Sequence, residues 1–348
     1  MKNIAIIGAG MSGIVAARTL TQAGHHVEVF EKSQGVGGRM STRETTFGNF
    51  DHGAQYFTVR DARFKKALDE VAGTAQVHKA WSANAVRVLD PLGRVIEAPL
   101  PHRESHFVGS PGMNALVRHW AQPLQSANQL HTSTLITQIV RHANHQKKWQ
   151  VIADIDLKLK QTSFDHVILA MPHVQTAQLL RQSGSNAVGF SGLALLDRVT
   201  VAPCWTLMLA YPNASQPGLS HLGPQWNAAR STHHRIAWLS RESSKPNRKS
   251  IERWTVQASA QWSTEHLEDD EMRVRAKLIK AFAELTGIRA EPAYAQAHRW
   301  RYAKTLQPLG QNFLWDEKLS IGTCGDWHIG HRVEDAFISG LSLALHLS

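Results

Sequence analysis

The chain has 348 residues, 43% of them hydrophobic, which is enough material for more than one buried core. There is no apolar run of about eighteen residues, which excludes a membrane span, and no CxxC pair among the two cysteines, so a dithiol motif and a cysteine zinc site are unsupported. The net charge of +10 is scattered, which argues against a nucleic-acid partner and is compatible with steering of an anionic substrate. The opening residues lack a secretory signal, so we expect a reduced, cytoplasmic protein that binds no membrane.

The first predicted element is a buried parallel strand over residues 4–7, followed at once by a glycine turn and a helical pattern as far as residue 20. Gly8 permits the tight turn, Gly10 lets the backbone approach a pyrophosphate, and Gly13 lets the helix pack closely on the strand. The helix N-terminus adds unpaired N–H donors. A second strand over residues 26–30 leads to Glu31, which can accept a hydrogen bond from a ribose hydroxyl. This unit predicts dinucleotide binding.

The continuation after Glu31 indicates which dinucleotide is bound. A second glycine turn, Gly35-Val-Gly37-Gly38-Arg39, resembles the continuation found in flavoproteins of the amine-oxidase superfamily. Extra backbone and a planar guanidinium can both approach a pyrophosphate there. We therefore expect FAD, bound noncovalently, rather than a nicotinamide cofactor.

The far end of the chain matches the same superfamily. Residues 320–340 read as a short strand, then Gly325-Asp326, then a helix from about Val333. The resemblance implies that Asp326 lies by the ribityl or pyrophosphate segment and that the helix points its positive end at the isoalloxazine N1/O2 edge, where reduced flavin is negatively charged. Asp335 either opposes that field or caps the helix.

Two central strands complete the expected FAD site. By the same resemblance, Ile136 in residues 131–140 meets the adenine, and Ala170 in residues 164–172 lies near the cofactor. The predicted FAD-binding residues are Gly8, Gly10, Met11, Ser12, Gly13, Glu31, Lys32, Gly38, Arg39, Met40, Ile136, Ala170, Gly325, Asp326, Arg332, Val333 and Ala336.

Longer motifs narrow the family. "GGRMSTRE" (37–44), "FDHGAQYF" (50–57), "SPGMNALVRHW" (110–120) and "GDWHIGHRVEDAFISG" (325–340) together resemble bacterial renalase-like proteins, over essentially the whole chain. The resemblance implies oxidation of dihydronicotinamide dinucleotides reduced at the 2- or 6-position. Hydride would pass to flavin N5, O2 would reoxidise the flavin to give H2O2, and the product would be NAD(P)+.

The expected fold is α/β, with a Rossmann-like FAD-binding domain and a mixed-sheet substrate domain, in the two-domain topology of p-hydroxybenzoate hydroxylase. The FAD-binding domain is expected to be discontinuous, over residues 1–75, 104–185 and 300–348. The substrate domain is expected over residues 76–103 and 186–299.

Four residues are candidates for contact with the reacting rings. By resemblance, Gln55 and Tyr56 pass near the flavin, although a sheet-edge hydrogen bond accounts for Gln55 equally well. His234 and Trp238 alternate as on a half-buried strand and are expected to share one face. Hydride transfer requires mainly alignment and exclusion of water, so no acid–base triad is expected.

Charged and imidazole side chains leave several alternatives open. Arg43 meets either phosphate or solvent, and Lys245 meets either the substrate pyrophosphate or, more simply, solvent in a loop. His328 and His331 are three residues apart without a third ligand nearby, so no metal is expected.

Two other functions remain open: an amine oxidase of the same superfamily and a non-catalytic flavin-binding redox protein. Amine oxidases often present an aromatic cage to a neutral amine, and no cage pair is evident from the spacing of the four tyrosines. The oligomeric state cannot be read from the sequence.

Overall fold

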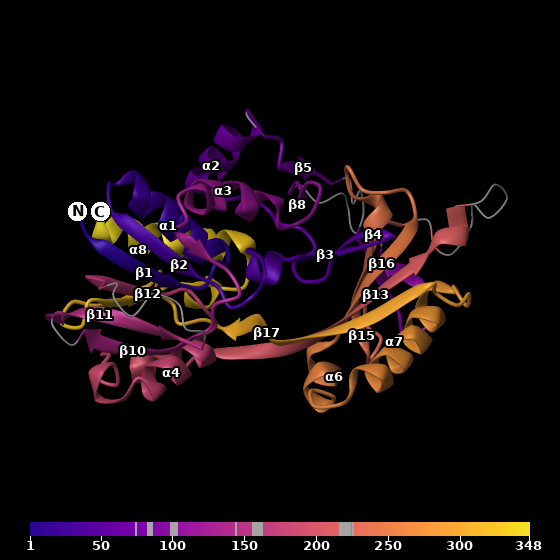
Figure 1. Cartoon of the computed structure of the whole chain (residues 1–348). Helices are drawn as coiled ribbons and strands as arrows, with labels where there is room; N and C mark the ends of the chain where they lie inside the picture. The colour runs from indigo at the N-terminus through magenta and orange to yellow at the C-terminus, as the bar shows by residue number, and fades with distance from the viewer. Residues whose placement is uncertain are drawn as a thin grey trace.

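The computed structural model describes residues 1–73, 75–81, 86–97, 104–142, 145–154, 163–215, 224 and 226–348. Figure 1 shows two lobes, one holding both chain termini and the other built around the long strands β13 and β17. Each lobe contains a large sheet, and the mixed α/β class expected from the sequence is confirmed.

The first lobe is built on a six-stranded sheet. In spatial order its strands are β18 (Leu314–Asp316), β19 (Ile321–Thr323), β12 (His166–Leu169), β1 (Asn3–Ile7), β2 (His26–Phe30) and β9 (Leu130–His131). Neighbouring strands run parallel except for β18 and β19. Helix α1 (Met11–Gln22) follows β1. The predicted strand–turn–helix unit is therefore confirmed.

Both faces of this sheet are covered, as the continuous apolar run of β1 predicts. Ile4 and Ile6 belong to the core on the side of α1, whereas Ala5 and Ile7 belong to the core on the opposite side. The elements that share the first core with α1 are α2 (Ala62–Ala72), α3 (Ala115–Ser126) and α8 (Val333–Leu347). The elements of the second core are α4 (His173–Gln182), β10 (Ile136–His142) and β11 (His145–Ala153).

The second lobe is built on a seven-stranded sheet. Its strands, in spatial order, are β17 (Tyr294–Gln307), β13 (Thr200–Tyr211), β16 (Glu252–Ala258), β15 (Ile236–Arg241), β14 (Ala228–Ser231), β6 (Arg87–Leu89) and β7 (Val95–Glu97). Leu207 and Leu209 on β13 pack in a core with α7 (Glu271–Thr286), next to the short helix α6 (Ala260–Glu265). Met208 and Ala210, on the other face of β13, meet Phe50 of the hairpin formed by β3 (Thr42–Thr45) and β4 (Gly48–Asp51).

The remaining short elements lie between these strands and helices along the chain. They are η1 (Gly38–Met40), β5 (His78–Ala80), β8 (Phe107–Gly109), η3 (Gly184–Asn186), α5 (Leu193–Leu196), η4 (Pro212–Ser215), η5 (Glu242–Ser244) and η6 (Asp326–His328). Strand β17 pairs with β13 along residues 294–307, across the domain boundary predicted after residue 299, so the exact division of the chain stays a prediction.

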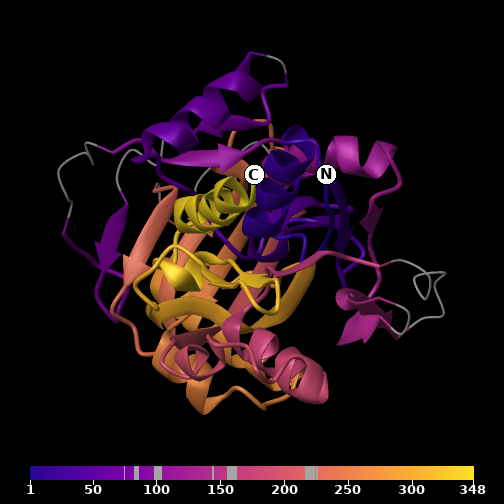
Figure 2. The ribbon, with the colours of Figure 1, turned by 90° about the vertical axis from the view of Figure 1, so that its left-hand side faces the viewer.

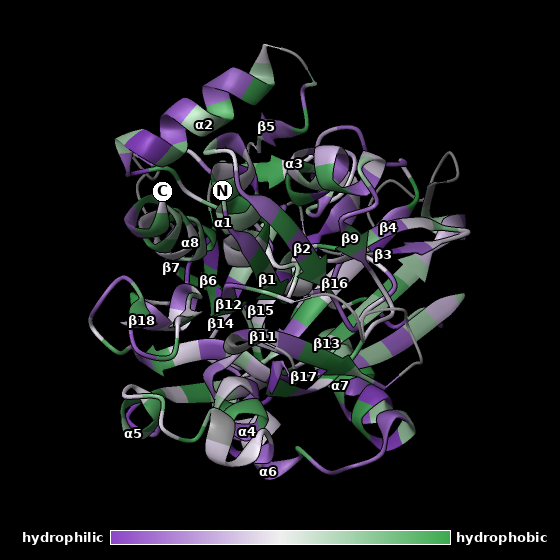
Figure 3. Cartoon of the chain, turned by 60° about the vertical axis from the view of Figure 1, so that its left-hand side comes forward, coloured by the Kyte–Doolittle hydropathy of each residue, from purple (hydrophilic) through white to green (hydrophobic). Residues whose placement is uncertain are grey.

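The hydropathy of the elements follows this layering. Figure 3 shows hydrophobic residues along central strands such as β2 and β13 and a largely hydrophilic outer face on α2. In the end-on view of Figure 2, α8 lies beside the N-terminal segment. The contact is close, because a Cβ at Gly340 of α8 would lie 2.2 Å from the carbonyl oxygen of Ser12 in α1. Within the described ranges, every helix is too short or too polar to span a bilayer.

Candidate functional site

The glycine turn after β1 leaves a helix N-terminus free for an anion. Gly10 is the N-cap of α1, with no side-chain cap and no acidic residue in the first turn. A Cβ at Gly10 would meet nothing within 4 Å, whereas a Cβ at Gly13 would lie 2.0 Å from the carbonyl oxygen of Gly8. Gly8 itself has a φ of 110°, a conformation that favours glycine. The turn is therefore closed toward β1 and open at Gly10, which fits a phosphate-binding loop.

Glu31 lies against this turn rather than in solvent. One carboxylate oxygen accepts a hydrogen bond of 2.8 Å from the N–H of Ala9, and the other accepts one of 2.8 Å from the N–H of Ser33. Because each oxygen can accept a further bond, the same carboxylate can hold the loop and still receive ribose hydroxyls. Lys32, also predicted to bind FAD, is exposed.

The second glycine turn joins the two ends of the chain. The N–H of Gly37 donates to the carbonyl oxygen of Ala9 at 2.9 Å, so the two turns lie side by side. The Arg39 guanidinium forms two hydrogen bonds to the carboxylate of Asp326, one of them 2.9 Å long. Arg39 thus forms a salt bridge with Asp326. The contact of Arg39 with the FAD pyrophosphate stays a prediction.

The helix at the C-terminal end begins where the sequence predicts. Helix α8 starts at Val333, and the carboxylate of Asp335 accepts a hydrogen bond of 2.8 Å from the N–H of Arg332. This confirms the capping alternative for Asp335. Glu334 is also engaged, because its carboxylate accepts bonds of 2.7 Å from the backbone N–H groups of Arg60 and Asp61.

The other predicted FAD residues line the same region of the first lobe. Ala170 is buried, and its N–H donates to the carbonyl oxygen of Ile7 at 2.8 Å, beside the glycine turn. Ile136 is the buried first residue of β10. The remaining residues are Met11, Ser12 and Met40, all buried, Gly38 and Arg332, both exposed, Val333 and Ala336, both half-buried, and Gly325 at the start of η6.

Tyr56 and Trp238 are brought together at the interface of the two lobes. Their ring centroids are 5.7 Å apart, and Tyr56 also packs on His106 at 4.2 Å. Trp238 is buried, and its indole N–H has no partner among the described residues. The three rings form an aromatic wall that comes from segments far apart in the chain.

His234 does not join this wall, and the expected shared face with Trp238 is wrong. Strand β15 begins only at Ile236 and carries a bulge before Trp238, so the alternation does not extend back to His234. The exposed His234 ring stacks on His233 at 4.4 Å, and His233 lies 3.4 Å from Glu284 of α7. This side of the sheet is opposite the first lobe.

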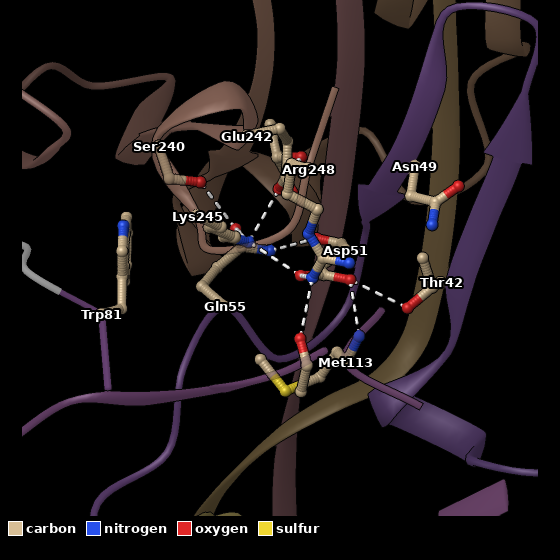
Figure 4. Close-up of polar contacts among 12 residues, drawn as sticks. Thr42, Asn49, Asp51, Gln55, Trp81, Met113, Ser240, Glu242, Lys245 and Arg248 are labelled. Atoms are coloured by element: carbon tan, nitrogen blue, oxygen red, sulfur yellow. Dashed lines mark hydrogen bonds and ion pairs between the residues drawn. The ribbon is translucent and has the colours of Figure 1, made fainter. Parts of the chain in front are cut away.

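A buried charge network ties the two lobes together beside Gln55 (Figure 4). The Lys245 ammonium lies 3.0 Å from the Asp51 carboxylate and 2.8 Å from that of Glu242. The Arg248 guanidinium lies 2.7 Å from the same Asp51 oxygen. The side chains of Asp51, Glu242 and Lys245 are 0% exposed, so neither a substrate contact nor a solvated loop describes Lys245.

Gln55 is held inside this network. Its side-chain amide donates to the backbone carbonyl oxygens of Asp51 and Gly53, and its side-chain oxygen accepts a bond of 2.7 Å from the Ser240 hydroxyl. Lys245 approaches the same oxygen at 3.5 Å. The amide therefore fixes the segment that carries Tyr56, and the predicted approach of Gln55 to the flavin stays a prediction.

The electrostatics of the network follow from burial and pairing. Burial disfavours the charged form of Asp51, but Lys245 and Arg248 outweigh that cost and hold the pKa of the Asp51 carboxyl below its usual range. Burial raises the pKa of Glu242, and Lys245 offsets this only in part. Two cations and two carboxylates leave the cluster balanced.

Sequence reasoning missed Asp51, Glu242 and Arg248. Asp51 lies 194 residues before Lys245, and no local pattern marks residues so far apart as partners. The alternation of side chains along β4 could have identified Asp51. Phe50 and His52 face one side of the strand, so Asp51 faces the other. A carboxylate buried on that side needs a cationic or hydrogen-bonding partner.

The two histidines near α8 lie in different surroundings. His328 is fully buried with Nε2 3.0 Å from the Thr323 hydroxyl, and burial lowers the pKa of His328 to about 3. His331 is exposed. No group of three or more His, Cys, Asp or Glu residues with metal-binding geometry is found in the described part of the chain.

Comparison with known proteins assigns this architecture to a family. A model of the family described as flavin containing amine oxidoreductase matches residues 97–347, and a model of NAD(P)-binding Rossmann-like domains matches residues 6–71. The chain belongs to the flavin containing amine oxidoreductase family. FAD is the family's cofactor, and the open glycine turn with its uncapped helix fits FAD in this chain.

Solved structures share the fold over nearly the whole chain. A protein from Exiguobacterium sp. 255-15, provisionally named a protoporphyrinogen oxidase, superposes with a TM-score of 0.74 at 12% identity and covers 99% of this chain and 98% of its own. Cyclohexylamine oxidase from Brevibacterium oxydans IH-35A gives a TM-score of 0.71 at 13% identity, with the same coverage. At such identities the likeness concerns the fold alone.

Curated relatives such as the following match a short stretch of the chain. A 4,4'-diapophytoene desaturase from Staphylococcus haemolyticus is 42% identical over 67 residues. The match covers 19% of this chain and 13% of the desaturase. A match of this length carries no information on the substrate.

Proposed function

We propose that this flavoprotein oxidises dihydronicotinamide dinucleotides reduced at the 2- or 6-position. One such molecule, one proton and O2 would give one NAD(P)+ and one H2O2. The sequence motifs that resemble bacterial renalase-like proteins suggest this reaction, and membership of an amine oxidoreductase family is compatible with it.

The observation that carries the proposal is that the carboxylates around the site already have partners within the protein. An amine substrate is a cation before it binds, whereas a dinucleotide is an anion, and the two call for opposite charges in the protein. The carboxylates of the candidate site are engaged by protein cations or backbone N–H groups: Glu31, Asp51, Glu242, Asp326, Glu334 and Asp335. Cations of the protein offset the charges of Asp51, Glu242 and Asp326, and the chain carries a net charge of +10, which supports an anionic rather than a cationic substrate.

The chain's own residues would bind and orient the reactants. The glycine turn and the α1 N-terminus would hold the FAD pyrophosphate, and Glu31 the ribose. Bound FAD supplies a two-electron acceptor for hydride. The aromatic wall of Tyr56, Trp238 and His106 offers flat apolar surfaces that align a nicotinamide ring and exclude water.

The state of the two cysteines supports direct transfer of electrons from the reduced flavin to an external acceptor, without a dithiol in between. Burial raises the pKa of the Cys204 thiol to about 11 and that of Cys324 to about 12, so both stay protonated at neutral pH. Cys204 lies on β13 of the seven-stranded sheet, whereas Cys324 directly follows β19 of the six-stranded sheet. A dithiol relay is therefore not supported.

Amine oxidation is the second candidate, and the family description favours it. Both candidates remove hydride from a carbon close to nitrogen, so the same cofactor serves either. They differ in substrate charge and in product.

The experiment is aerobic turnover of the FAD-loaded chain with separate substrates: 2-, 4- and 6-dihydro-NAD, the corresponding NADP forms, and the amines putrescine and cyclohexylamine. We expect H2O2 and NAD(P)+ to form in equal amounts from the 2- or 6-isomers. Ordinary 4-dihydro forms should react much more slowly. H2O2 formed from the amines alone would assign the chain to the second candidate, and no H2O2 from any compound would favour a non-catalytic flavin protein.

A further inference from the structure

Arg43, which has no ion-pair partner among the described residues, lies beside the buried His52 and the half-buried His298 where the β3–β4 hairpin meets β17. Arg43 is opposite Phe50 in the hairpin, so both side chains point to the same face. Phe50 packs on Tyr294 of β17 with ring centroids 5.5 Å apart. Arg43 therefore faces β17, and His52, two residues after Phe50, continues along that face.

Two residues of β17 complete the cluster from the other side. His298 and Trp300 are two residues apart on one strand and share a face. The His52 ring lies edge-on to His298 at 4.8 Å and stacks on Trp300 at 5.3 Å. The Trp300 indole N–H also donates to the backbone carbonyl oxygen of His52 at 2.8 Å. The hairpin and the strand are thus locked together around these side chains.

Among the described residues no carboxylate pairs with this cluster, because the nearby Asp51 is already paired with Lys245 and Arg248. Arg43 forms no ion pair with any carboxylate in the described ranges, and its neighbour Glu44 points to Arg118 instead. The Arg43 Nε and the Nδ1 of His52, whose side chain is buried, have no hydrogen-bond partner among the described residues. Unsatisfied buried donors are costly, so the site is suited to a ligand that accepts hydrogen bonds.

The two imidazoles respond to the uncompensated guanidinium. Burial, then His298 and Arg43, lower the pKa of His52 to about 3, and burial followed by Arg43 lowers the pKa of His298 to about 4. An anion placed between them would reverse this effect, because it would stabilise both the guanidinium and the protonated rings.

The cluster adjoins the segment that reaches the FAD turn. His52 precedes Gly53, where a Cβ would lie 2.0 Å from the carbonyl oxygen of Arg39, and the N–H of Ala54 donates to that oxygen at 2.8 Å. A ligand held by Arg43 is therefore close in the chain and in space to the residues that position the flavin.

We propose that Arg43, His52 and His298 form a binding site for the pyrophosphate of the dinucleotide substrate, an assignment that rests on the proposed function. The guanidinium supplies paired N–H donors that match phosphate oxygens, and the imidazoles supply further donors. The cofactor pyrophosphate belongs to the α1 N-terminus, so the chain would hold two pyrophosphates at separate places.

The test is isothermal titration of the FAD-loaded chain with inorganic pyrophosphate, ADP-ribose and adenosine. Arg43→Gln should weaken pyrophosphate and ADP-ribose binding about tenfold or more and leave adenosine unaffected. Arg301→Gln is the matched control, because Arg301 lies on β17 but pairs with Glu268. His298→Asn serves as a second variant, and the flavin absorbance confirms that each variant is folded.

Three results would overturn the assignment: unchanged pyrophosphate binding in Arg43→Gln, equal weakening in Arg301→Gln, or pyrophosphate binding that ADP-ribose does not displace. The last result would identify a site for free phosphate instead. With the isomeric dinucleotides as substrates, Arg43→Gln should raise KM about tenfold and leave kcat within about twofold. If the wild type oxidises none of these dinucleotides, the proposed function fails, while the titrations still decide whether the anion site exists.

Discussion

At the scale of single residues, Lys245 is the cation that pairs with both buried carboxylates of the network, Asp51 and Glu242. Its ammonium lies between two carboxylates at 0% exposure and 5.6 Å from the centre of the Trp81 ring. Removing one partner of a buried pair leaves the other charge without compensation, which costs far more than losing a surface pair. Lys245 therefore contributes to stability mainly by keeping Asp51 and Glu242 satisfied.

Lys245→Met should lower the free energy of unfolding by about 3–5 kcal/mol, measured by urea denaturation with tryptophan fluorescence. Lys65→Met is the control, because Lys65 pairs with Asp69 on α2 while both side chains stay more than 60% exposed. The control should cost about 0.5 kcal/mol or less. Equal costs for the two variants would show that the network is not buried as described.

The same residue marks a limit of sequence reasoning. Lys245 stands in "SSKP", a run typical of a solvated loop, and its partner Asp51 belongs to a motif interpreted for its neighbours Gln55 and Tyr56. Burial of Lys245 is decided by the packing of two lobes, which no local pattern encodes. The position of Glu31 beside the glycine turn, by contrast, was predictable from the strand end that precedes it, and its contact with a ribose stays a prediction.

At the scale of elements, the turn between β1 and α1 contains glycines with two different roles, one in packing and one in cofactor binding. Gly13 has no room for a side chain because of the Gly8 carbonyl oxygen, whereas Gly10 faces open space where the cofactor phosphate is expected. Gly10 has a φ of −74°, which alanine also adopts, so its backbone requires no glycine.

The same substitution at the two positions should therefore have different effects. Gly13→Ala should destabilise the fold by about 1–3 kcal/mol or more through overpacking. Gly10→Ala should unfold at nearly the wild-type temperature without cofactor and bind FAD at least about tenfold more weakly. Thermal unfolding of the FAD-free proteins and FAD titration measure the two effects, and equal loss of stability in both variants would contradict this division.

Element boundaries were predictable where local chemistry sets them. The glycine turn and the start of α8 at Val333 both follow from capping and turn residues next to apolar runs. The start of β15 was not predictable, because "HHRIAW" alternates like a strand while a tight connection from β14 bends the chain at His234. The anion cluster needed the register of β3 and β4 as well as the path of β17.

For the whole molecule, buried neutral histidines couple stability to pH. Burial lowers the pKa of both His52 and His328 to about 3, whereas an unfolded histidine titrates near about 6.5. Between these values the unfolded chain binds more protons than the folded one, so stability falls as the pH falls below about 6.5. The raised pKa of Glu242 acts in the opposite direction.

Replacing one histidine isolates its share of this effect. Between pH 7 and pH 5, wild type should lose about 2 kcal/mol more unfolding free energy than His328→Asn, from about 1.4 kcal/mol per pH unit below 6.5. His234→Asn, at an exposed position, should follow wild type. Urea denaturation at both pH values, in phosphate-free buffer, provides the comparison. Parallel pH profiles for His328→Asn and wild type would show that His328 is not held neutral.

The central claim is that this member of the amine oxidoreductase family binds an anionic dinucleotide, with Asp51, Glu242 and Asp326 paired to protein cations and Arg43 without an ion-pair partner among the described residues. The most direct measurement is the rate of flavin bleaching when the FAD-loaded chain is mixed without oxygen with 2- or 6-dihydro-NADP, with ordinary 4-dihydro-NADPH and with putrescine. The account predicts rapid bleaching by a 2- or 6-isomer and slow or no bleaching by the other two. Faster bleaching by putrescine than by either isomer would contradict it.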